Sequence, residues 1–274
     1  MYLLKVNNLI KRYGQRTVVN GVSFHIERAE IVGLLGRNGA GKTTSFRMTI
    51  GMITPDGGEV IFDGQDATRL PMYQRANRGI GYLSQEPSIL RRATVEQNLS
   101  AFLELQPLSK AEQRERLEAL LHQFDLGKTR KQQARTLSGG ERRKLEIARC
   151  LIKNPDLILL DEPFSGVDPL AVEDLQREIL RLRAQRGIAM LITDHNVQQT
   201  LRVCDRAYIM DDGRILAEGT PKDLVRDPLV REHYLGSMFR GDEFDERPDE
   251  ILAGSPAAAA SGGGRSGRRQ KRGT

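Results

Sequence analysis

Four apolar runs along the chain have the length and composition of buried β-strands. Each is short, largely aliphatic and followed by glycine or polar residues, and they occupy positions 30–35, 79–84, 157–160 and 188–193. Continuous aliphatic runs are typical of strands in a parallel sheet that is covered on both faces. The pattern therefore predicts an α/β core.

Shorter stretches of alternating or apolar residues precede the first of these runs. Positions 3–6, 17–19 and 22–26 predict a small antiparallel sheet, built on the edge of the parallel one. Two further strands are predicted at 207–210 and 214–217, because the Asp-Asp-Gly between them is typical of a hairpin turn.

Between about 88 and 154 the strand pattern gives way to a helical one. Apolar residues recur at helical spacing between 110 and 124. Two Ser/Thr residues are followed three positions later by Glu or Gln, which is the capping-box signal of a helix start, and the pairs are Thr94 with Gln97 and Ser109 with Glu112. The segment is predicted to be a helical subdomain inserted into the α/β core.

The first buried run leads into a glycine loop, residues 36–44, that fits the pattern G-x-x-x-x-G-K-[ST]. A strand, this loop and a helix form the context in which the pattern binds phosphate, because loop N–H groups and the helix N-terminus favour an anion. Lys42 is expected to reach the β- and γ-phosphates of a nucleoside triphosphate, and Thr43 to ligate Mg²⁺. The other expected nucleotide contacts in the loop are Gly36, Asn38, Gly39, Gly41 and Thr44.

A second glycine-containing helix start lies at Ser138, Gly139 and Gly140. Ser138 and Glu141 have capping-box spacing, and an apolar stripe follows them. Glycines at a helix start expose N–H donors to an anion, so all three residues are candidate nucleotide contacts. They lie too far along the chain to belong to the first loop. The basic run at 142–144 is expected to lie on a solvated helix face.

Two carboxylates, Asp161 and Glu162, follow the buried run at 157–160. Because side chains alternate along a strand, adjacent acids point in different directions and can serve different purposes. Asp161 is expected to bind Mg²⁺, and Glu162 to orient or deprotonate water. These are two roles that hydrolysis of a nucleoside triphosphate requires.

Other polar residues follow strands on the edge where ligands of open α/β sheets bind. Gln85 is a candidate for contacting Mg²⁺ or the attacking water, and His195 for hydrogen-bonding a γ-phosphate. Asp168 either contacts nucleotide or caps the helix that follows it. Tyr13 either offers an aromatic face to an adenine or is a partly buried sheet residue.

Charge and composition narrow the class of protein. The net charge is +6, but residues 241–250 (six acids, one Arg, net −5) and 265–274 (five bases, net +5) cancel, so the excess belongs to residues 1–240. This modest excess is typical of an ordinary surface, and no nucleic-acid partner is expected. The two cysteines lack CxxC spacing and predict neither a disulfide framework nor a zinc site.

No apolar run in the sequence approaches the 18 residues expected of a membrane-spanning helix. We also expect no signal peptide, so any contact with a membrane is expected to run through other proteins. Residues 241–274 lack a periodic apolar pattern and are expected to be a disordered, low-complexity tail.

The order of these motifs resembles that of the nucleotide-binding subunit of an ATP-binding cassette (ABC) transporter. The motifs are the phosphate loop, Gln85, residues 137–141, residues 159–162, Asp168 and His195. The resemblance covers residues 1–240 and implies a P-loop NTPase fold of the RecA-like type. It also implies ATP and Mg²⁺ as ligands, ATP hydrolysis coupled to transport, and a homodimer that sandwiches two ATP molecules head to tail. Ser138 and Gly140 of one subunit would then meet ATP held by the other.

Longer runs resemble the ATPase of the bacterial lipopolysaccharide export system, at positions 79–92, 137–149, 161–169 and 192–197. This resemblance implies a role in extracting lipopolysaccharide from the inner membrane towards the outer membrane. The protein would act on the cytoplasmic face of the inner membrane, with two integral membrane permease subunits docked near Gln85 to Arg92. The sequence departs from that family at Ser84, where Pro is usual, and at Cys150, where Ala is usual.

Three other functions share part of this motif set. The ATPase of a branched-chain amino acid importer is the nearest, but its sequence after the Gln85 position usually differs from Leu90-Arg91-Arg92. A soluble ABC ATPase of DNA repair or translation usually carries two cassettes or a long coiled-coil insertion. A GTPase or small-molecule kinase has no use for residues 137–141.

Overall fold

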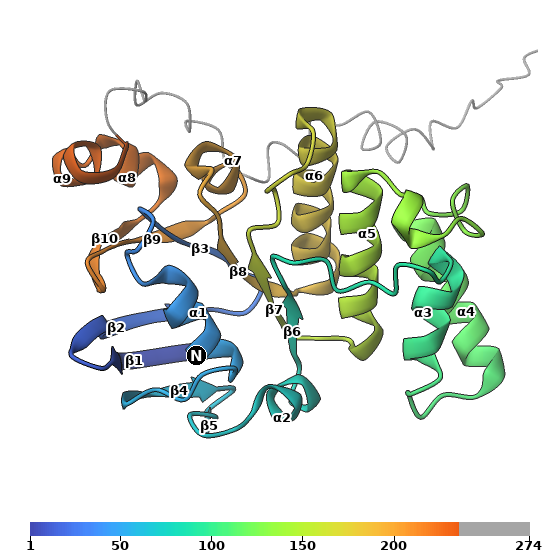
Figure 1. The fold of residues 1–274 in the computed structure, drawn as a ribbon, viewed down its shortest axis with the longest axis horizontal. Coiled ribbons are helices and arrows are strands. Elements are labelled where there is room, and N and C mark those ends of the chain that lie inside the picture. Colours follow the sequence, from blue (N-terminus) through green and yellow to red (C-terminus); the bar gives the residue numbers. More distant parts are fainter. Residues whose placement is uncertain (236–274) are drawn as a thin grey trace, which may run out of the picture.

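A six-stranded sheet forms the centre of the molecule. The structure, a computed structural model, describes residues 1–235 of the 274-residue chain, so the predicted tail at 241–274 lies outside the described residues. In spatial order the strands are β10 (Arg214–Gly219), β9 (Arg206–Asp211), β3 (Ile31–Gly36), β8 (Ala189–Thr193), β7 (Leu157–Asp161) and β6 (Ile80–Leu83) (Figure 1). The four aliphatic runs are thus four neighbouring strands, as predicted.

The central strands each serve two hydrophobic cores. Neighbouring strands from β9 to β6 pair in parallel, and β10 pairs antiparallel with β9 at one edge. Because side chains alternate along a strand, Leu157 and Leu159 of β7 enter one core while Ile158 and Leu160 enter the other. Alternate residues of β8 divide in the same way. Burial on both faces explains why these strands are aliphatic throughout.

The smaller sheet covers one face of the larger one. Its strands are antiparallel, in the order β2 (Arg16–Ile26), β1 (Leu4–Tyr13), β4 (Gly57–Phe62) and β5 (Gln65–Asp66). The predicted antiparallel strands are therefore present, but they form a sheet of their own and do not extend the edge of the parallel sheet. The reason is that β1, β2 and β4 pack apolar side chains into the core that they share with β3 and β7.

Helix α1 (Lys42–Ile50) contributes Phe46, Met48 and Ile50 to this shared core. Its C-terminal carbonyl groups at Met48 and Thr49 accept hydrogen bonds from the buried guanidinium of Arg75, in α2 (Met72–Asn77). A cation at the C-terminus of a helix complements the helix dipole. The C-terminal end of α1 is therefore held in place by α2.

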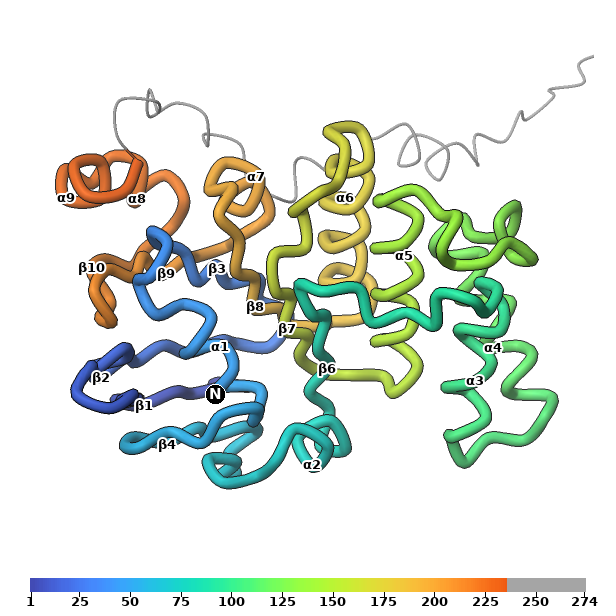
Figure 2. The backbone as a smooth tube through the Cα atoms, viewed as in Figure 1, coloured from blue at the N-terminus to red at the C-terminus, as the bar shows by residue number. Residues whose placement is uncertain are grey.

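Helices cover the opposite face of the large sheet. The tube in Figure 2 leaves β6, passes through α3 (Val95–Leu103) and α4 (Lys110–Gln123), and returns through α5 (Gly139–Cys150) to β7. The capping boxes predicted at the starts of α3, α4 and α5 are all present. Within the described range 88–154 the structure has helices and turns, and no strand of either sheet.

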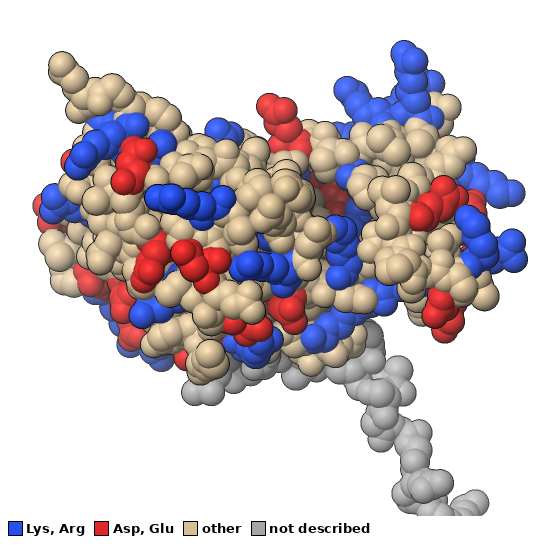
Figure 3. Space-filling model, turned by 90° about the horizontal axis from the view of Figure 1, so that it is seen from below, with Lys and Arg blue, Asp and Glu red and all other residues tan. Residues whose placement is uncertain are grey.

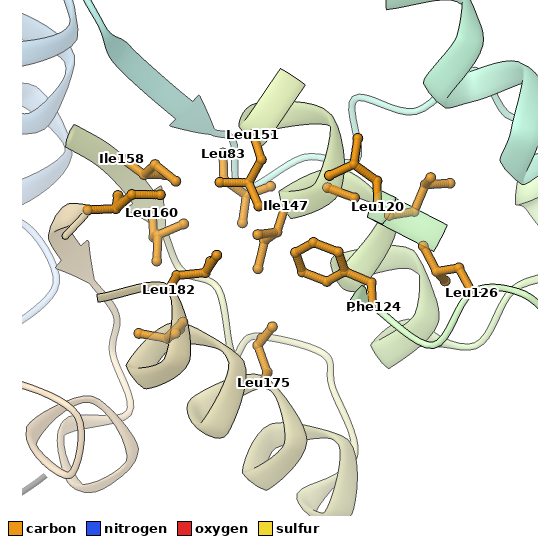
Figure 4. Close-up of a cluster of buried hydrophobic side chains, with 14 of the residues drawn as sticks. Leu83, Leu120, Phe124, Leu126, Ile147, Leu151, Ile158, Leu160, Leu175 and Leu182 are labelled. Carbon is orange, nitrogen blue, oxygen red and sulfur yellow. The ribbon is translucent and has the colours of Figure 1, made fainter. Parts of the chain in front are cut away.

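A single hydrophobic cluster joins these helices to the sheet. Figure 4 shows side chains from β6, β7, α4, α5 and α6 (Pro169–Arg186) meeting between the strands and the helices. Phe124 at the end of α4 lies across from Ile147 of α5 and Leu175 of α6. The helical segment is thus attached to the core mainly through α5.

The remaining helical elements are short; four follow β8 in the sequence, and the two 3-10 turns lie before β7. They are α7 (Val197–Leu201), α8 (Pro221–Arg226), α9 (Pro228–Val230), the short π-helix η3 (Arg231–Leu235), and the 3-10 turns η1 (Ala134–Thr136) and η2 (Leu151–Lys153). On the face drawn in Figure 3, acidic and basic side chains are interspersed. Within residues 1–235, none of the helices has both the length and the apolar character needed to cross a bilayer.

Candidate active site

The phosphate loop, residues 36–44, joins β3 to α1 and needs glycine at two close approaches. Gly41 has a φ of 98°, and a Cβ there would lie 2.7 Å from the carbonyl oxygen of Val18. Gly36 has a φ of 149°, and a Cβ there would lie 2.2 Å from the carbonyl oxygen of Met210. Both values of φ are unfavourable for other residues, so a side chain at either position would force the loop away from β2 or β9.

Lys42 is held inside this loop by main-chain oxygens. Its Nζ donates hydrogen bonds to the carbonyl oxygens of Gly36 (2.6 Å) and Arg37 (3.0 Å). Burial lowers the pKa of the ammonium group, and the charges of Glu162, Asp194 and Asp161 oppose that shift. The cation is therefore desolvated and close to three carboxylates. On the same turn Thr43 is exposed and Thr44 is half-buried, while Asn38 and Gly39 are exposed in the loop.

Asp161 ends strand β7 with a side chain that is almost completely buried. Only 3% of the residue is exposed, and it accepts a hydrogen bond from the Tyr82 hydroxyl of β6. Burial, together with the nearby charge of Glu162, raises the pKa of Asp161 to about 6. A buried carboxylate of this kind gains from a neighbouring cation, because the cation restores the interactions lost with water.

Glu162 turns away from the strand. Its φ of 48° is left-handed, which is uncommon for a residue with a side chain, and its N–H donates to the carbonyl oxygen of Thr193 (2.7 Å). The turn directs the Glu162 carboxylate out of the core, away from the position of Asp161. The prediction that these adjacent acids have different surroundings is met: one contacts Tyr82, and the other contacts Gln85 and His195.

Two side chains, which follow β6 and β8, converge at the carboxylate of Glu162, which follows β7. The Nε2 group of Gln85 donates to Glu162 Oε2 at 2.8 Å. His195 Nδ1 lies 3.5 Å from the same oxygen, and its side chain is 57% exposed. The imidazole therefore remains accessible to a ligand while it borders the carboxylate. The structure thus brings together Lys42, Asp161, Glu162, Gln85 and His195.

Asp194 is a buried member of this site that the sequence interpretation did not single out. It is 1% exposed and accepts hydrogen bonds from the N–H groups of Phe164 (3.2 Å) and Asn196 (2.9 Å). Burial raises the pKa of its carboxyl group. Asp194 therefore ties the loop after Glu162 to the loop that carries His195. Its place at the end of a buried strand, next to His195, was the available signal.

Arg143 corrects the expectation that residues 142–144 lie on a solvated helix face. It is 6% exposed, and its guanidinium faces the loops that carry Gln85 and Glu162. The reason is that α5 packs against β6, and Arg143 lies one turn before the core residue Ile147 on the same side of the helix. Its partner Glu146 is also buried, with Arg143 Nη1 2.8 Å from Glu146 Oε2.

The predicted second anion-binding element lies at the start of α5. Ser138 is exposed and caps the helix, accepting from the N–H of Glu141 at 3.3 Å. Gly140 is buried, and a Cβ there would lie 2.6 Å from the Cβ of Ala171, so the helix starts of α5 and α6 are in close contact. Gly139 is half-buried between them. The hydrogen bonds of Ser138 run to residues of its own helix, and none in the described residues joins it to the phosphate loop.

Two further predicted contacts have mixed outcomes. Asp168 caps α6 by accepting from the N–H of Ala171 at 3.0 Å, so the capping interpretation is confirmed, and its possible contact with nucleotide stays a prediction. Tyr13 ends β1 with 51% of its surface exposed, and the Lys11 ammonium lies 5.7 Å from the centre of its ring. Such an exposed ring is available for stacking.

Comparison with known proteins places these features in one group. A family profile described as "ABC transporter" matches residues 19–165, and a second, "Branched-chain amino acid ATP-binding cassette transporter", matches residues 214–240. The chain is 51% identical over 238 residues to the lipopolysaccharide export system ATP-binding protein LptB of Acidithiobacillus ferridurans, covering 87% of this chain and 98% of that protein.

Further matches agree over most of the chain. The protein of the same name from Escherichia coli strain K12 is 51% identical over 241 residues, covering 88% of this chain and 100% of the relative. Among solved structures, a nucleotide-free ATP-binding cassette from an ABC transporter is similar with a TM-score of 0.77 and 31% identity. That match covers 86% of this chain and 100% of the other.

Proposed function

Because the chain belongs to the ABC transporter family, we propose that it is the ATP-binding and ATP-hydrolysing subunit of a lipopolysaccharide export system. The observation that carries the proposal is the convergence of Gln85 and His195 on Glu162, with Lys42 of the phosphate loop close by. The choice of lipopolysaccharide rests on the relatives of that name, which match over nearly their full length.

ATP fits the phosphate loop on physical grounds. The close approaches at Gly36 and Gly41 exclude side chains at these two positions, so their main-chain N–H groups would be open to a phosphate. The Lys42 ammonium is desolvated and bonded only to carbonyl oxygens, which a phosphate group would replace with a stronger, charged acceptor. Asn38, Gly39 and Thr44 would supply further contacts, and the exposed ring of Tyr13 a stacking face for adenine.

Mg²⁺ also suits the donors present, with Thr43, Gln85 and Asp161 as the proposed ligands. Among residues 1–235, no three His, Cys, Asp or Glu side chains gather as a metal site. That agrees with Mg²⁺, which is commonly held by one or two carboxylates together with substrate phosphates. When bound, the ion would neutralise charge on the phosphates.

Glu162, Gln85 and His195 would act on the water and the terminal phosphate. Glu162 is positioned to orient a water and accept its proton, because its carboxylate is outside the core and within reach of solvent. Gln85 holds one oxygen of that carboxylate in place. His195, whose side chain is 57% exposed, would hydrogen-bond the γ-phosphate.

The start of α5 supports a head-to-tail homodimer. Ser138 and Gly140 stand at a helix N-terminus, where N–H groups favour an anion, yet their own chain's phosphate loop is not their hydrogen-bonding partner. A second copy, turned through a two-fold axis, would bring each such helix start to the ATP of the other subunit. Asp168, at the adjoining start of α6, would lie at the same interface.

Docking to two integral membrane permease subunits is proposed near Gln85 to Arg92. Leu90 is 46% exposed, and Arg91 and Arg92 beside it are exposed, which gives an apolar contact with a basic rim. The protein would thus be peripheral, on the cytoplasmic face of the inner membrane. In this scheme residues 1–240 form one nucleotide-binding domain, and residues 88–154 form its helical subdomain.

The branched-chain amino acid importer is the second candidate, supported by the family match at residues 214–240. That match covers a short C-terminal segment, whereas the 51% identity to the export proteins extends over 238 residues or more. Export is therefore favoured over import.

Affinity purification from detergent-solubilised membranes of the host tests the export function. We expect two polytopic membrane proteins and lipopolysaccharide to accompany the wild-type protein. A Leu90→Asp variant should lose these partners and keep ATP hydrolysis, because Leu90 lies outside the cluster around Glu162. Recovery of an amino-acid permease pair would support the importer, and recovery only from the soluble fraction would contradict a transport role.

A further inference from the structure

One buried ion pair on α5 holds both loops of the hydrolysis site. We propose that Arg143, fixed by Glu146, is a positioning residue that sets the geometry between Gln85 and Glu162. The proposal rests on the roles given to Gln85 and Glu162 above. It is carried by six hydrogen bonds made by side chains of α5, and no nucleotide or partner subunit is needed to explain them.

The guanidinium of Arg143 bridges two main-chain segments. Its Nη1 donates to the carbonyl oxygen of Ser84 (2.9 Å), the residue before Gln85. Its Nη2 donates to the carbonyl oxygen of Glu162 itself (2.9 Å), and its Nε to that of Pro163 (3.3 Å). A planar, forked group with five N–H donors suits this task, because it can serve several fixed acceptors at once.

The other side of the Gln85 loop is held by the same helix. Glu146 accepts from Arg143 through Oε2 (2.8 Å) and from the N–H of Ser88 through Oε1 (3.0 Å). Arg149 Nη1 donates to the carbonyl oxygen of Ser88 (2.7 Å). The short loop that carries Gln85 is therefore anchored to α5 at Ser84 and at Ser88.

The energetics favour a positioning role over a stabilising one. Arg143 and Glu146 are 6% and 2% exposed, so both charges are removed from water. Such a pair often adds little net stability, because desolvation offsets the attraction, and an apolar pair of similar size is often as stable. What an apolar pair lacks is the set of donors and acceptors that fix the two loops.

The start of α5 is connected to both loops through the same helix. Ser138 caps α5, and Arg143 lies five residues further along it, so a shift of α5 would move the anchors of both loops together. Contact at the exposed end of α5 is thus mechanically connected to the Gln85 and Glu162 side chains within one chain.

ATPase kinetics of the purified full chain test the proposal. In the double variant Arg143→Met/Glu146→Met we expect kcat to fall at least tenfold and KM for ATP to stay within twofold, because the phosphate loop is untouched. Arg143→Lys keeps the charge but has fewer fixed donors, so its kcat should lie between those of the wild type and the double variant. Arg183→Met is the matched control, since Arg183 is also buried (7% exposed) and is ion-paired with Asp205. Among residues 1–235, none of its hydrogen bonds joins it to the loops that carry Gln85 and Glu162.

The kcat values of these variants distinguish a positioning role of Arg143 from a purely structural one. A kcat within twofold of wild type in the folded double variant overturns the proposal, as does an equal loss of kcat in Arg183→Met. If the double variant does not fold, Glu146→Gln replaces it, and an unchanged kcat there has the same meaning. Absence of ATP hydrolysis in the wild-type protein would instead refute the proposed function.

Discussion

Gln85 and Glu162 are joined side chain to side chain by a 2.8 Å hydrogen bond across 77 positions of sequence. One follows β6 and the other follows β7, which are neighbouring parallel strands. The carboxyl ends of parallel strands share an edge, so the sheet itself brings the two residues together.

Lys42→Ala should abolish ATP hydrolysis and weaken ATP binding by at least tenfold. The reason is that Lys42 is the only loop side chain whose cation lies among the loop carbonyl oxygens of the described structure. Binding is measured by equilibrium titration with a fluorescent ATP analogue, and turnover by phosphate release. Normal turnover in this variant would refute the phosphate-loop assignment.

Glu162→Gln should retain ATP binding and lose at least a hundredfold in hydrolysis rate. An amide keeps the shape and can still accept a hydrogen bond from Gln85, but it cannot take a proton from water. Because bound ATP is not hydrolysed, the variant should accumulate as a dimer, which light scattering after size-exclusion chromatography detects. A monomer with ATP bound would speak against the proposed sandwich.

Ser138→Ala and Ser109→Ala form a matched pair. Each serine is the cap of a complete capping box, at the start of α5 and of α4, so each variant should lose about 1 kcal/mol of unfolding free energy. Only Ser138 is proposed to meet the nucleotide of a second subunit, so only Ser138→Ala should lose tenfold or more in ATPase rate. Equal activities in the two variants would remove Ser138 from the site. Urea unfolding and phosphate release supply the two measurements.

Asp161 should make stability depend on pH in the absence of metal and nucleotide. Its pKa is raised to about 6 in the folded chain, against 3.8 for the free group, so the folded state holds the proton more tightly. Its contribution to stability is therefore complete below about pH 4 and is lost as pH rises through 6. Asp161→Asn lacks this loss, so its unfolding free energy should rise relative to that of wild type by about 1 kcal/mol between pH 5 and pH 8.

Urea unfolding in EDTA at several pH values checks this expectation. Added Mg²⁺ with ATP should reduce the advantage of Asp161→Asn at pH 8, because the wild-type carboxylate then has a cation to bind. A difference between the two proteins that is constant with pH would contradict the burial-driven shift.

Local signals predicted most of the elements correctly. Aliphatic runs identify strands because burial on both faces of a sheet leaves no polar positions, as at 157–160. Capping boxes identify helix starts because the bonds are made within four residues, as at Ser109. The antiparallel strands were predicted, but not that they form a separate sheet, because the face that this sheet covers depends on long-range packing.

The site residues that directly end or follow a strand could be predicted from the sequence. Gln85, Asp161, Glu162 and His195 could be assigned to one edge from the order of strands and loops alone. Arg143 could not, because a basic residue in a charged run has the sequence pattern of a solvated helix face. Its burial depends on how α5 is rotated against β6, which no local pattern encodes.

The two cores that meet across β7 and β8 have a consequence for unfolding. Each strand supplies alternate side chains to both cores, so neither core can lose its packing without exposing the strands on which the other depends. Hydrogen exchange at the amides of Leu159 and Leu191 should therefore require global opening, with one cooperative transition for both cores. Because Asp161 ends β7 and Glu162 follows it, we expect Asp161 and Glu162 to be carried by one of the slowest-exchanging segments of residues 1–235.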